Sequence, residues 1–207
     1  KCINCGACVA GCPFGAISDV SMMTGVIDAL LDPKREVVAL IAPSIEGQFG
    51  TATIPQIKAA IRRLGFDDVY EVALGADMVA VNEAEELLEH KAAGMATTSS
   101  CCPAFVSMVR KHFPDLMKFV STTVSPMVAV ERYVRTKRPD VTTVFVGPCI
   151  AKKNEVMGSY IGELDYALTF EELYAMLCAK DIEPNGEETG EEDATRYGKG
   201  FALSGGV

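Results

Sequence analysis

The residues of this sequence best suited to chemistry are its cysteines, which are grouped rather than scattered. Four of the eight cysteines form one run near the start of the chain, at Cys2, Cys5, Cys8 and Cys12. Cys101 and Cys102 are adjacent, and Cys149 follows Pro148. Thiolate sulfur is a preferred ligand of iron and zinc. The grouping therefore predicts an iron–sulfur site at one end of the chain and a second metal site further along.

The run has the spacing C-x2-C-x2-C-x3-C-P, which is typical of bacterial ferredoxins and their 4Fe-4S clusters. Structural zinc sites more often use two separated C-x2-C pairs, so zinc is the less favoured alternative. In two-cluster ferredoxins the fourth cysteine binds the other cluster. We therefore expect Cys2, Cys5 and Cys8 to hold the cluster nearer the rest of this chain. Cys12 would then serve a neighbouring cluster whose other ligands precede residue 1.

Composition excludes several classes of protein. Hydrophobic residues make up 49% of the chain, so a core can form without disulfides, which are typical of small secreted domains. We expect a reduced, cytoplasmic setting, although the chain does not begin with Met and leaves room for an upstream targeting segment. The net charge of −9 argues against nucleic acid or anionic membrane surfaces as partners. No apolar run approaches the roughly twenty residues of a membrane span.

Hydrophobic patterning predicts an α/β fold, with mixed or parallel sheets flanked by helices. Strands are predicted at residues 36–41, 68–72, 141–146 and 166–168, and helices at residues 56–64, 77–90, 104–113, 126–136 and 170–179. Thr169 and Glu172 form a candidate capping box worth about 1 kcal/mol. We expect a partial ferredoxin-like segment over residues 1–31 and one larger domain over residues 32–207.

The positions of the later cysteines suggest different roles for them. Cys149 follows a predicted strand, and ligands of α/β sheets gather at the carboxyl ends of strands. Cys101 and Cys102 are neighbours at a helix start, where successive side chains diverge by about 100°. One of the two can therefore be a metal ligand while the other is not. A thiol near a metal but not bound to it can carry protons, because thiols ordinarily titrate near pH 8.5.

Two stretches around these cysteines resemble motifs of one family, the catalytic domain of [FeFe]-hydrogenases. Residues 99–105 are similar to its Thr-Ser-Cys-Cys-Pro motif followed by an aromatic residue, and residues 148–155 are similar to its Pro-Cys-x-x-Lys-x-x-Glu motif. Residues 42–44, 62–77 and 204–207 are also similar to the family. The resemblance implies the large-domain fold of iron-only hydrogenases. It also implies reversible oxidation of H2 and reduction of protons, with a ferredoxin or another redox protein as partner.

The resemblance also implies a cofactor, the H-cluster, in which a 4Fe-4S cubane is bridged by a cysteine to a diiron unit. The diiron unit carries CO, cyanide and a bridging dithiolate amine. Cys102 and Cys149 match two of the four cubane ligands. The other two belong to a third motif, which in the family follows the Gly-Gly-Val stretch where this sequence stops. We therefore expect a fragment that cannot hold the complete cofactor alone.

The resemblance assigns a proton path and a pocket. Cys101 matches the thiol that passes protons to the bridging amine, and Glu83 and Glu86 match the carboxylates of the path, with Ser121 as the hydroxyl between them. Read without the family, these glutamates are the solvated face of a helix. Lys152 matches the lysine that donates to a cyanide, a charge-assisted bond worth roughly 1.5–3 kcal/mol, and Lys153 is expected to be solvated. The residues expected to line the cofactor pocket are Pro43, Ser44, Met127, Pro148 and Phe201.

Two positions depart from the family. Gly147 stands where well-studied members have Met, and Met127 stands where they have Gln. A methionine exchanged between two walls of the pocket would keep its volume and alter hydrogen bonding to the bridging ligand. A hydrogenase homologue that senses H2 or redox state is therefore an alternative. A second alternative is a hydrogenase-like iron–sulfur assembly protein without the diiron unit, although Cys101 and Lys152 argue against it.

Overall fold

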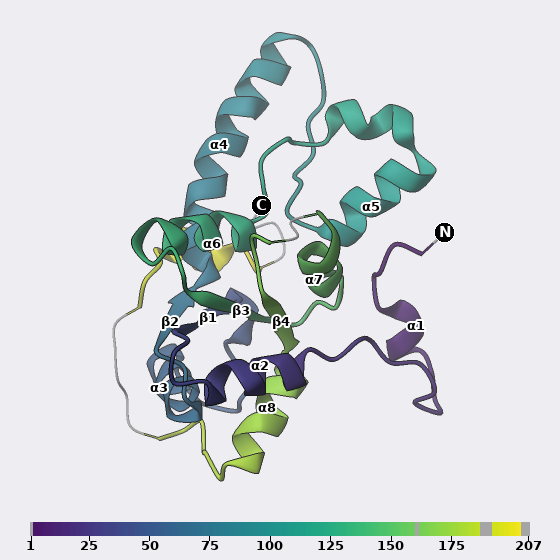
Figure 1. Ribbon diagram of the computed structural model, residues 1–207. Coiled ribbons are helices and arrows are strands. Elements are labelled where there is room, and N and C mark those ends of the chain that lie inside the picture. The colour runs from purple at the N-terminus through teal and green to yellow at the C-terminus, as the bar shows by residue number, and fades with distance from the viewer. Residues whose placement is uncertain (1, 160–161, 187–191, 204–207) are drawn as a thin grey trace.

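The computed structural model describes residues 2–159, 162–186 and 192–203 (Figure 1). Their centre is a sheet with the strand order β2-β1-β3-β4. The strands are β1 (Val37–Ile41), β2 (Asp68–Glu71), β3 (Thr142–Gly147) and β4 (Tyr166–Thr169). Every pair in this sheet is parallel. The predicted α/β fold is therefore confirmed, and each predicted strand is present within one or two residues of its expected bounds.

Helices surround the sheet. They are α1 (Ala7–Ala10), α2 (Met23–Leu31), α3 (Ile54–Leu64), α4 (Val72–Ala92), α5 (Pro103–His112), α6 (Pro126–Lys137), α7 (Ala151–Asn154), α8 (Phe170–Ala179) and α9 (Arg196–Gly200). Shorter turns are the 3-10 helices η1 (Pro43–Ile45) and η2 (Pro114–Phe119) and the π-helical turn η3 (Glu155–Ser159). In the described part of the chain, no helix is both long and apolar enough to cross a bilayer.

The central strands are buried on both faces, which explains their continuous apolar sequence. All five residues of β1 are buried. Helices α4 and α6 lie on one side of the sheet, and α2, α3 and α8 lie on the other (Figure 1). Parallel strands place η1, the start of α4, Cys149 and the start of α8 at one edge, the carboxyl edge of the sheet, where the candidate residues were expected to gather.

Helix α2 was not predicted, because its start lacks a capping signal. Met22 precedes it without a side-chain cap, and Gly25 lies inside its first turn. Tertiary contacts stabilise it instead: Val26 and Ala29 are fully buried, and the Ala167 N–H donates to the Met22 sulfur at 3.2 Å. Residues before position 32 thus share the core of the sheet, and the proposed division of the chain at residue 31 stays a prediction.

Two local features fix the helices that matter for the site. The predicted capping box of α8 is confirmed, with the Glu172 N–H donating to Thr169 Oγ1 at 3.2 Å and the Thr169 N–H to Glu172 Oε2 at 2.8 Å. Helix α4 crosses α6 at Gly75, where a Cβ atom would lie 2.1 Å from the Pro126 carbonyl oxygen. Only glycine allows this close approach, after which α4 extends away from the sheet (Figure 1).

Candidate functional site

The two later cysteine motifs meet at the carboxyl edge of the sheet. Cys102 is the N-cap of α5 and has an extended backbone, while Pro103 occupies the first turn, where its missing N–H is no loss. Cys149 follows β3 and precedes α7, which contacts α5. Lys152 Nζ donates to the Cys101 carbonyl at 3.4 Å across 51 residues of sequence. Cys102 is exposed, and Cys101 and Cys149 are half-buried.

Glu83 on α4 is connected to the segment that carries Cys101. Its Oε1 atom accepts hydrogen bonds from Ser99 Oγ and from the Ser100 N–H, both at 3.1 Å. Ser99 Oγ in turn accepts from the Cys101 N–H at 3.3 Å. A short series of hydrogen bonds therefore joins the Glu83 carboxylate to the backbone of the candidate proton carrier.

Glu86 lies one turn further along α4 and has its own set of donors. Ser121 Oγ donates to Glu86 Oε2, and the N–H and Oγ1 of Thr122 donate to Oε1 at 2.9 and 3.1 Å. Burial acts to raise the pKa of Glu86, but these hydrogen bonds outweigh it and hold the pKa below its ordinary value. Glu86 is therefore ionised near neutral pH and can accept a proton.

The neighbouring glutamates of α4 separate the two interpretations of this helix. Glu85 and Glu89 are exposed, as a solvated face requires. Glu83 and Glu86 are half-buried and bonded to the loop segments at residues 97–100 and 121–123. Glu85 and Glu89 thus form the solvent-exposed face of α4. Glu83 and Glu86, which the family resemblance singled out, do not belong to that face.

A cavity of about 330 Å³ lies beside these carboxylates, and Glu83, Ser99, Ser121 and Phe201 are among the residues that line it. Ser121 thus borders the same space as Glu83 while bonding Glu86. Phe201 reaches this cavity at the end of α9. The predicted pocket residue Phe201 is therefore placed next to the predicted proton path.

The C-terminal segment that carries Phe201 is held against the core by polar contacts. Asp193 pairs with the buried Lys58 at 2.8 Å, and the Asp193 N–H donates at 2.8 Å to Glu71, whose pKa is raised by burial. Further along, Thr195 Oγ1 donates to Asp77 Oδ1 on α4 at 2.7 Å. Residues 204–207, which are part of the family resemblance, lie outside the described residues.

Three of the four remaining predicted pocket residues lie at the carboxyl edge of the sheet, and the fourth is buried in the core. Pro43 and Ser44 belong to η1, directly after β1, and α9 contacts η1. Pro148 is exposed at the end of β3. Met127 is only 1% exposed and belongs to the apolar core. These placements put the first three at the edge where the cysteine motifs meet, while Met127, in the first turn of α6, is part of the apolar core.

Gly147, the other departure from the family, has a steric explanation. A Cβ atom at this position would lie 2.5 Å from Cζ of Phe145. Positions 145 and 147 share one face of β3, so the Phe145 ring fills space that a residue-147 side chain would take. The Phe145 ring thus accounts for a glycine at position 147, and the exchange of a methionine between the pocket walls stays a prediction.

The N-terminal cysteines surround a second, separate pocket. Cys2, Cys5 and Cys8 line a space of about 540 Å³ together with residues of α7 and its flanks, including Ile150 and Lys153. Within the described residues, no three Cys, His, Asp or Glu side chains are close enough to hold one metal ion. The spacing of these three thiols is that of 4Fe-4S sites rather than of structural zinc sites.

Cys12 has surroundings of its own. The backbone N–H groups of Phe14 and Ala16 point at its sulfur and lower the pKa of the thiol. A lowered pKa favours the thiolate, which is the form that binds metal. The environment suits Cys12 as a metal ligand, and the cluster that it serves stays a prediction.

Two lysines follow Cys149, and the prediction was wrong for one of them. Lys152 pairs with Glu155 at 2.7 Å and is 12% exposed. Lys153 was expected to be solvated, but it is 2% exposed and pairs with Asp19 and Glu172. The expectation failed because Asp19 lies 134 residues away in sequence, where no local pattern could reveal it.

Sequence reasoning also missed several hydrogen-bond donors to the two carboxylates. Ser99, Ser100 and Thr122 were not proposed as parts of the path, yet each donates to Glu83 or Glu86. Ser99 and Ser100 could have been proposed from the sequence, because they directly precede Cys101. The partner Thr122 could have been found from its place next to Ser121.

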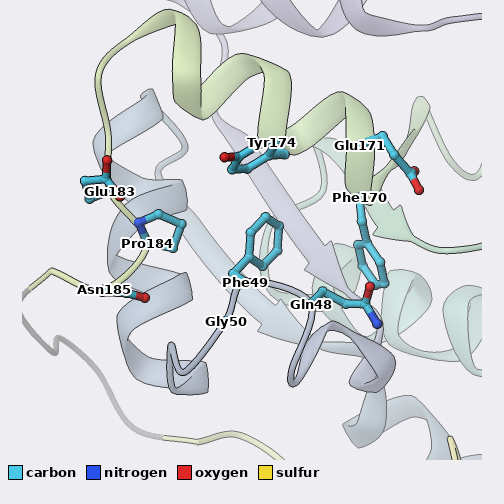
Figure 2. A pocket seen from close by; sticks show the side chains of 9 residues that line it. All are labelled: Gln48, Phe49, Gly50, Phe170, Glu171, Tyr174, Glu183, Pro184 and Asn185. Carbon is cyan, nitrogen blue, oxygen red and sulfur yellow. The ribbon is translucent and has the colours of Figure 1, made fainter.

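A further pocket lies away from the candidate residues, between α8, the turn after η1 and residues 183–185 (Figure 2). Its volume is about 380 Å³. Phe49 and Tyr174 face each other across it, with ring centroids 6.1 Å apart. Its lining contains no cysteine among the described residues, so we do not assign the metal chemistry to it.

Known proteins are similar to both parts of the chain. Residues 35–207 match the family described as iron only hydrogenase large subunit, C-terminal domain, and residues 1–18 match the 4Fe-4S binding domain. The HndD subunit of the NADP-reducing hydrogenase of Solidesulfovibrio fructosivorans is 29% identical, over 100% of this chain and 41% of its own length. Iron hydrogenase 1 of Clostridium pasteurianum is 30% identical, over 80% of this chain and 33% of its own length. The chain thus spans less than half the length of these relatives.

Solved structures and more distant relatives complete the comparison. The apo [FeFe]-hydrogenase HydA1 of Chlamydomonas reinhardtii, in a variant form, superposes with a TM-score of 0.75 at 27% identity, over 84% of this chain and 51% of that one. The cytosolic Fe-S cluster assembly factor NAR1 of Candida dubliniensis is 22% identical over 74% of this chain and 29% of its own length. With most of its length matched, the chain belongs to the iron-only hydrogenase large-subunit family, in the C-terminal domain of that subunit, and begins with a 4Fe-4S binding segment.

Proposed function

We propose that this chain is part of an [FeFe]-hydrogenase that oxidises H2 and reduces protons reversibly at an H-cluster. The observation that carries the proposal is the arrangement around Cys101. Its neighbour Cys102 caps α5, Lys152 reaches its carbonyl, and hydrogen bonds join its backbone to Glu83. A non-ligand thiol beside a candidate ligand, with titratable groups leading away from it, suits proton transfer to a metal site.

Cys102 and Cys149 would be two of the ligands that hold the cubane of the H-cluster. Cys2, Cys5 and Cys8 would hold a 4Fe-4S cluster beside α7, and Cys12 would serve a further cluster. The cofactor supplies the H–H bond chemistry and the electrons' path when bound. The chain's contribution is to supply thiolates, to orient the cofactor and to move protons.

The protein groups have distinct tasks in this proposal. The Cys101 thiol holds a proton next to the reacting site. Glu83 and Glu86, with the hydroxyls of Ser99 and Ser121, exchange protons between that thiol and the exposed end of α4. The Lys152 ammonium donates hydrogen bonds to an anionic group of the cofactor, and Glu155 balances its charge. A ferredoxin or another redox protein of a reducing, cytoplasmic setting would exchange electrons through the N-terminal segment.

Infrared spectroscopy of the matured intact protein tests this proposal. CO and cyanide ligands absorb in a region free of protein bands, so the expected result is a set of bands from both ligands together with H2 turnover. Ligand bands without turnover would support a sensing homologue instead. Absence of the bands after maturation by a system that loads a known hydrogenase would contradict the proposal.

A second candidate is an iron–sulfur assembly role without the diiron unit. The similarity to NAR1, at 22% identity over 74% of the chain, favours it. Such a role gives no task to the Cys101 thiol or to the carboxylates beside it. The infrared measurement separates the two candidates, because an assembly protein would bind iron and sulfide and show neither ligand band.

A further inference from the structure

We propose that Lys153 fixes the N-terminal cysteine segment to the catalytic domain and raises the reduction potential of the cluster that this segment binds. The inference rests on the proposed function only in taking Cys2, Cys5 and Cys8 as ligands of an iron–sulfur cluster. Lys153 lies on α7, one residue beyond the predicted cyanide donor Lys152, and is 2% exposed. A buried ammonium requires partners and exerts a strong field on its surroundings.

The partners of Lys153 come from both sides of the junction. Asp19 belongs to the N-terminal segment, and Glu172 belongs to the first turn of α8, where its carboxylate lies 2.8 Å from Lys153 Nζ. Glu172 is itself fixed by the capping box with Thr169. The ammonium therefore joins the N-terminal segment to the capped start of α8, and losing either ion pair would leave the buried charge with one carboxylate partner instead of two.

Two further contacts hold the cysteine loop on the same surface. Lys111 at the end of α5 donates to the Cys2 carbonyl. Gly6, between Cys5 and Cys8, lies against Ile150, so that a Cβ at Gly6 would be 3.1 Å from Ile150 Cδ1. Ile150 directly follows Cys149. Figure 1 shows the N-terminal segment alongside α7.

The charges that line the cysteine pocket are few. Among the described residues that form it, Lys153 is the cation and Asp19 is the anion. An added electron makes a cluster more negative, so the buried cation stabilises the reduced form and the carboxylate opposes it. Because Lys153 is shielded from water, salt screens its field less than that of a surface lysine. The two members of one ion pair should therefore shift the potential in opposite directions.

The test is a redox titration of the intact protein, reconstituted with iron and sulfide and followed by electron paramagnetic resonance of the N-terminal cluster. We expect Lys153→Met to reduce the equilibrium constant for one-electron reduction about tenfold, which corresponds to a fall of about 59 mV. Asp19→Asn should shift the potential upward. Lys153→Arg should restore most of the wild-type potential, and Lys180→Met, at an exposed lysine on the far side of the sheet, should leave it unchanged.

The directions in which the two substitutions shift the reduction potential distinguish an electrostatic role of Lys153 from a merely structural one. Both Lys153→Met and Asp19→Asn break the same ion pair, so each should increase hydrogen exchange at residues 2–20. If both variants shift the potential in the same direction, or neither shifts it, the charge-setting role is wrong. If Lys153→Met does not fold, the upward shift in Asp19→Asn still decides the matter. A wild-type protein that binds no N-terminal cluster would instead refute the proposed function.

Discussion

The two cysteine regions of this molecule are built in different ways. Cys2, Cys5, Cys8 and Cys12 come from eleven consecutive residues, contribute nothing to the apolar core and are mostly exposed. Cys101, Cys102 and Cys149 are brought together by β3, a strand of the buried parallel sheet, and by α7, which contacts both β4 and α5. The first region is encoded by spacing within one loop, whereas the second depends on the whole fold. Mutations in the core should therefore affect the second region and spare the first.

The largest effect is expected from Cys101→Ala in the intact, matured enzyme. Removing a group that transfers a proton to the reacting site should reduce turnover about 10²–10⁴-fold. The infrared bands of the cofactor and the signal of the N-terminal cluster should both remain, because Cys101 is not expected to bind iron in either region. Hydrogen evolution close to the wild-type rate would contradict the role of this thiol.

A change at the crossing of α4 and α6 should separate the two regions. Gly75→Ala places a Cβ against the Pro126 carbonyl, so the helices must move apart at a cost of about 1–3 kcal/mol in the free energy of unfolding. Urea unfolding measures this loss. Gly158→Ala is the matched control, because a Cβ there meets nothing within 4 Å.

The same substitution should leave iron binding by residues 2–12 intact while it lowers turnover, since Glu83 and Glu86 lie on the displaced helix. Equal loss of both clusters would show that the two regions are not independent.

Two helix N-caps, those of α8 and α6, should differ in how much they contribute to the free energy of unfolding. Thr169→Ala should lower the free energy of unfolding by about 1 kcal/mol, because Thr169 caps α8. Ser125→Ala, at the N-cap of α6, should have little effect or stabilise the fold. Ser125 makes no cap hydrogen bond, and its buried Oγ has no partner among the residues that the structure describes. Thermal or urea unfolding of both variants checks this, and similar losses for the two would contradict the capping account.

The pH dependence contributed by Glu86 is expected to be the smallest effect. The pKa of Glu86 is lower in the folded chain than its ordinary value of 4.5. Its stabilising contribution should therefore be complete above that value and be lost as the pH falls through the folded pKa. Glu86→Gln should flatten the acid limb of the stability curve, measured by urea unfolding between pH 3 and pH 6. An unchanged acid limb would show that the Ser121 and Thr122 bonds do not favour the ionised carboxylate.

Sequence patterns predicted the elements well and the long-range contacts poorly. The apolar run of β1 and the Thr169 cap carry their own signals, because strand burial and capping depend on neighbouring residues. Helix α2 carries no such signal and was missed, since its stability comes from packing on β4. Lys153 was placed in solvent because its partner Asp19 is distant in sequence.

The candidate site shows the same division. The cysteine spacings and the family resemblance suggested which residues to examine. Which hydroxyls meet Glu83 and Glu86, and that the Phe145 ring occupies the space beside Gly147, depend on how separate segments pack, and pairwise contacts of this kind are not written in one sequence. Such contacts require the three-dimensional arrangement of α4, the loops beside it and β3.

The central claim is that Cys102 and Cys149, from distant parts of the sequence, bind the same iron cluster. The most direct measurement is the iron content and Mössbauer spectrum of the intact protein with Cys102→Ala, Cys149→Ala or Cys101→Ala. The account predicts that the first two variants lose the same cluster and keep the N-terminal one, while the third keeps both. A Cys149→Ala protein with its full set of clusters would contradict the account.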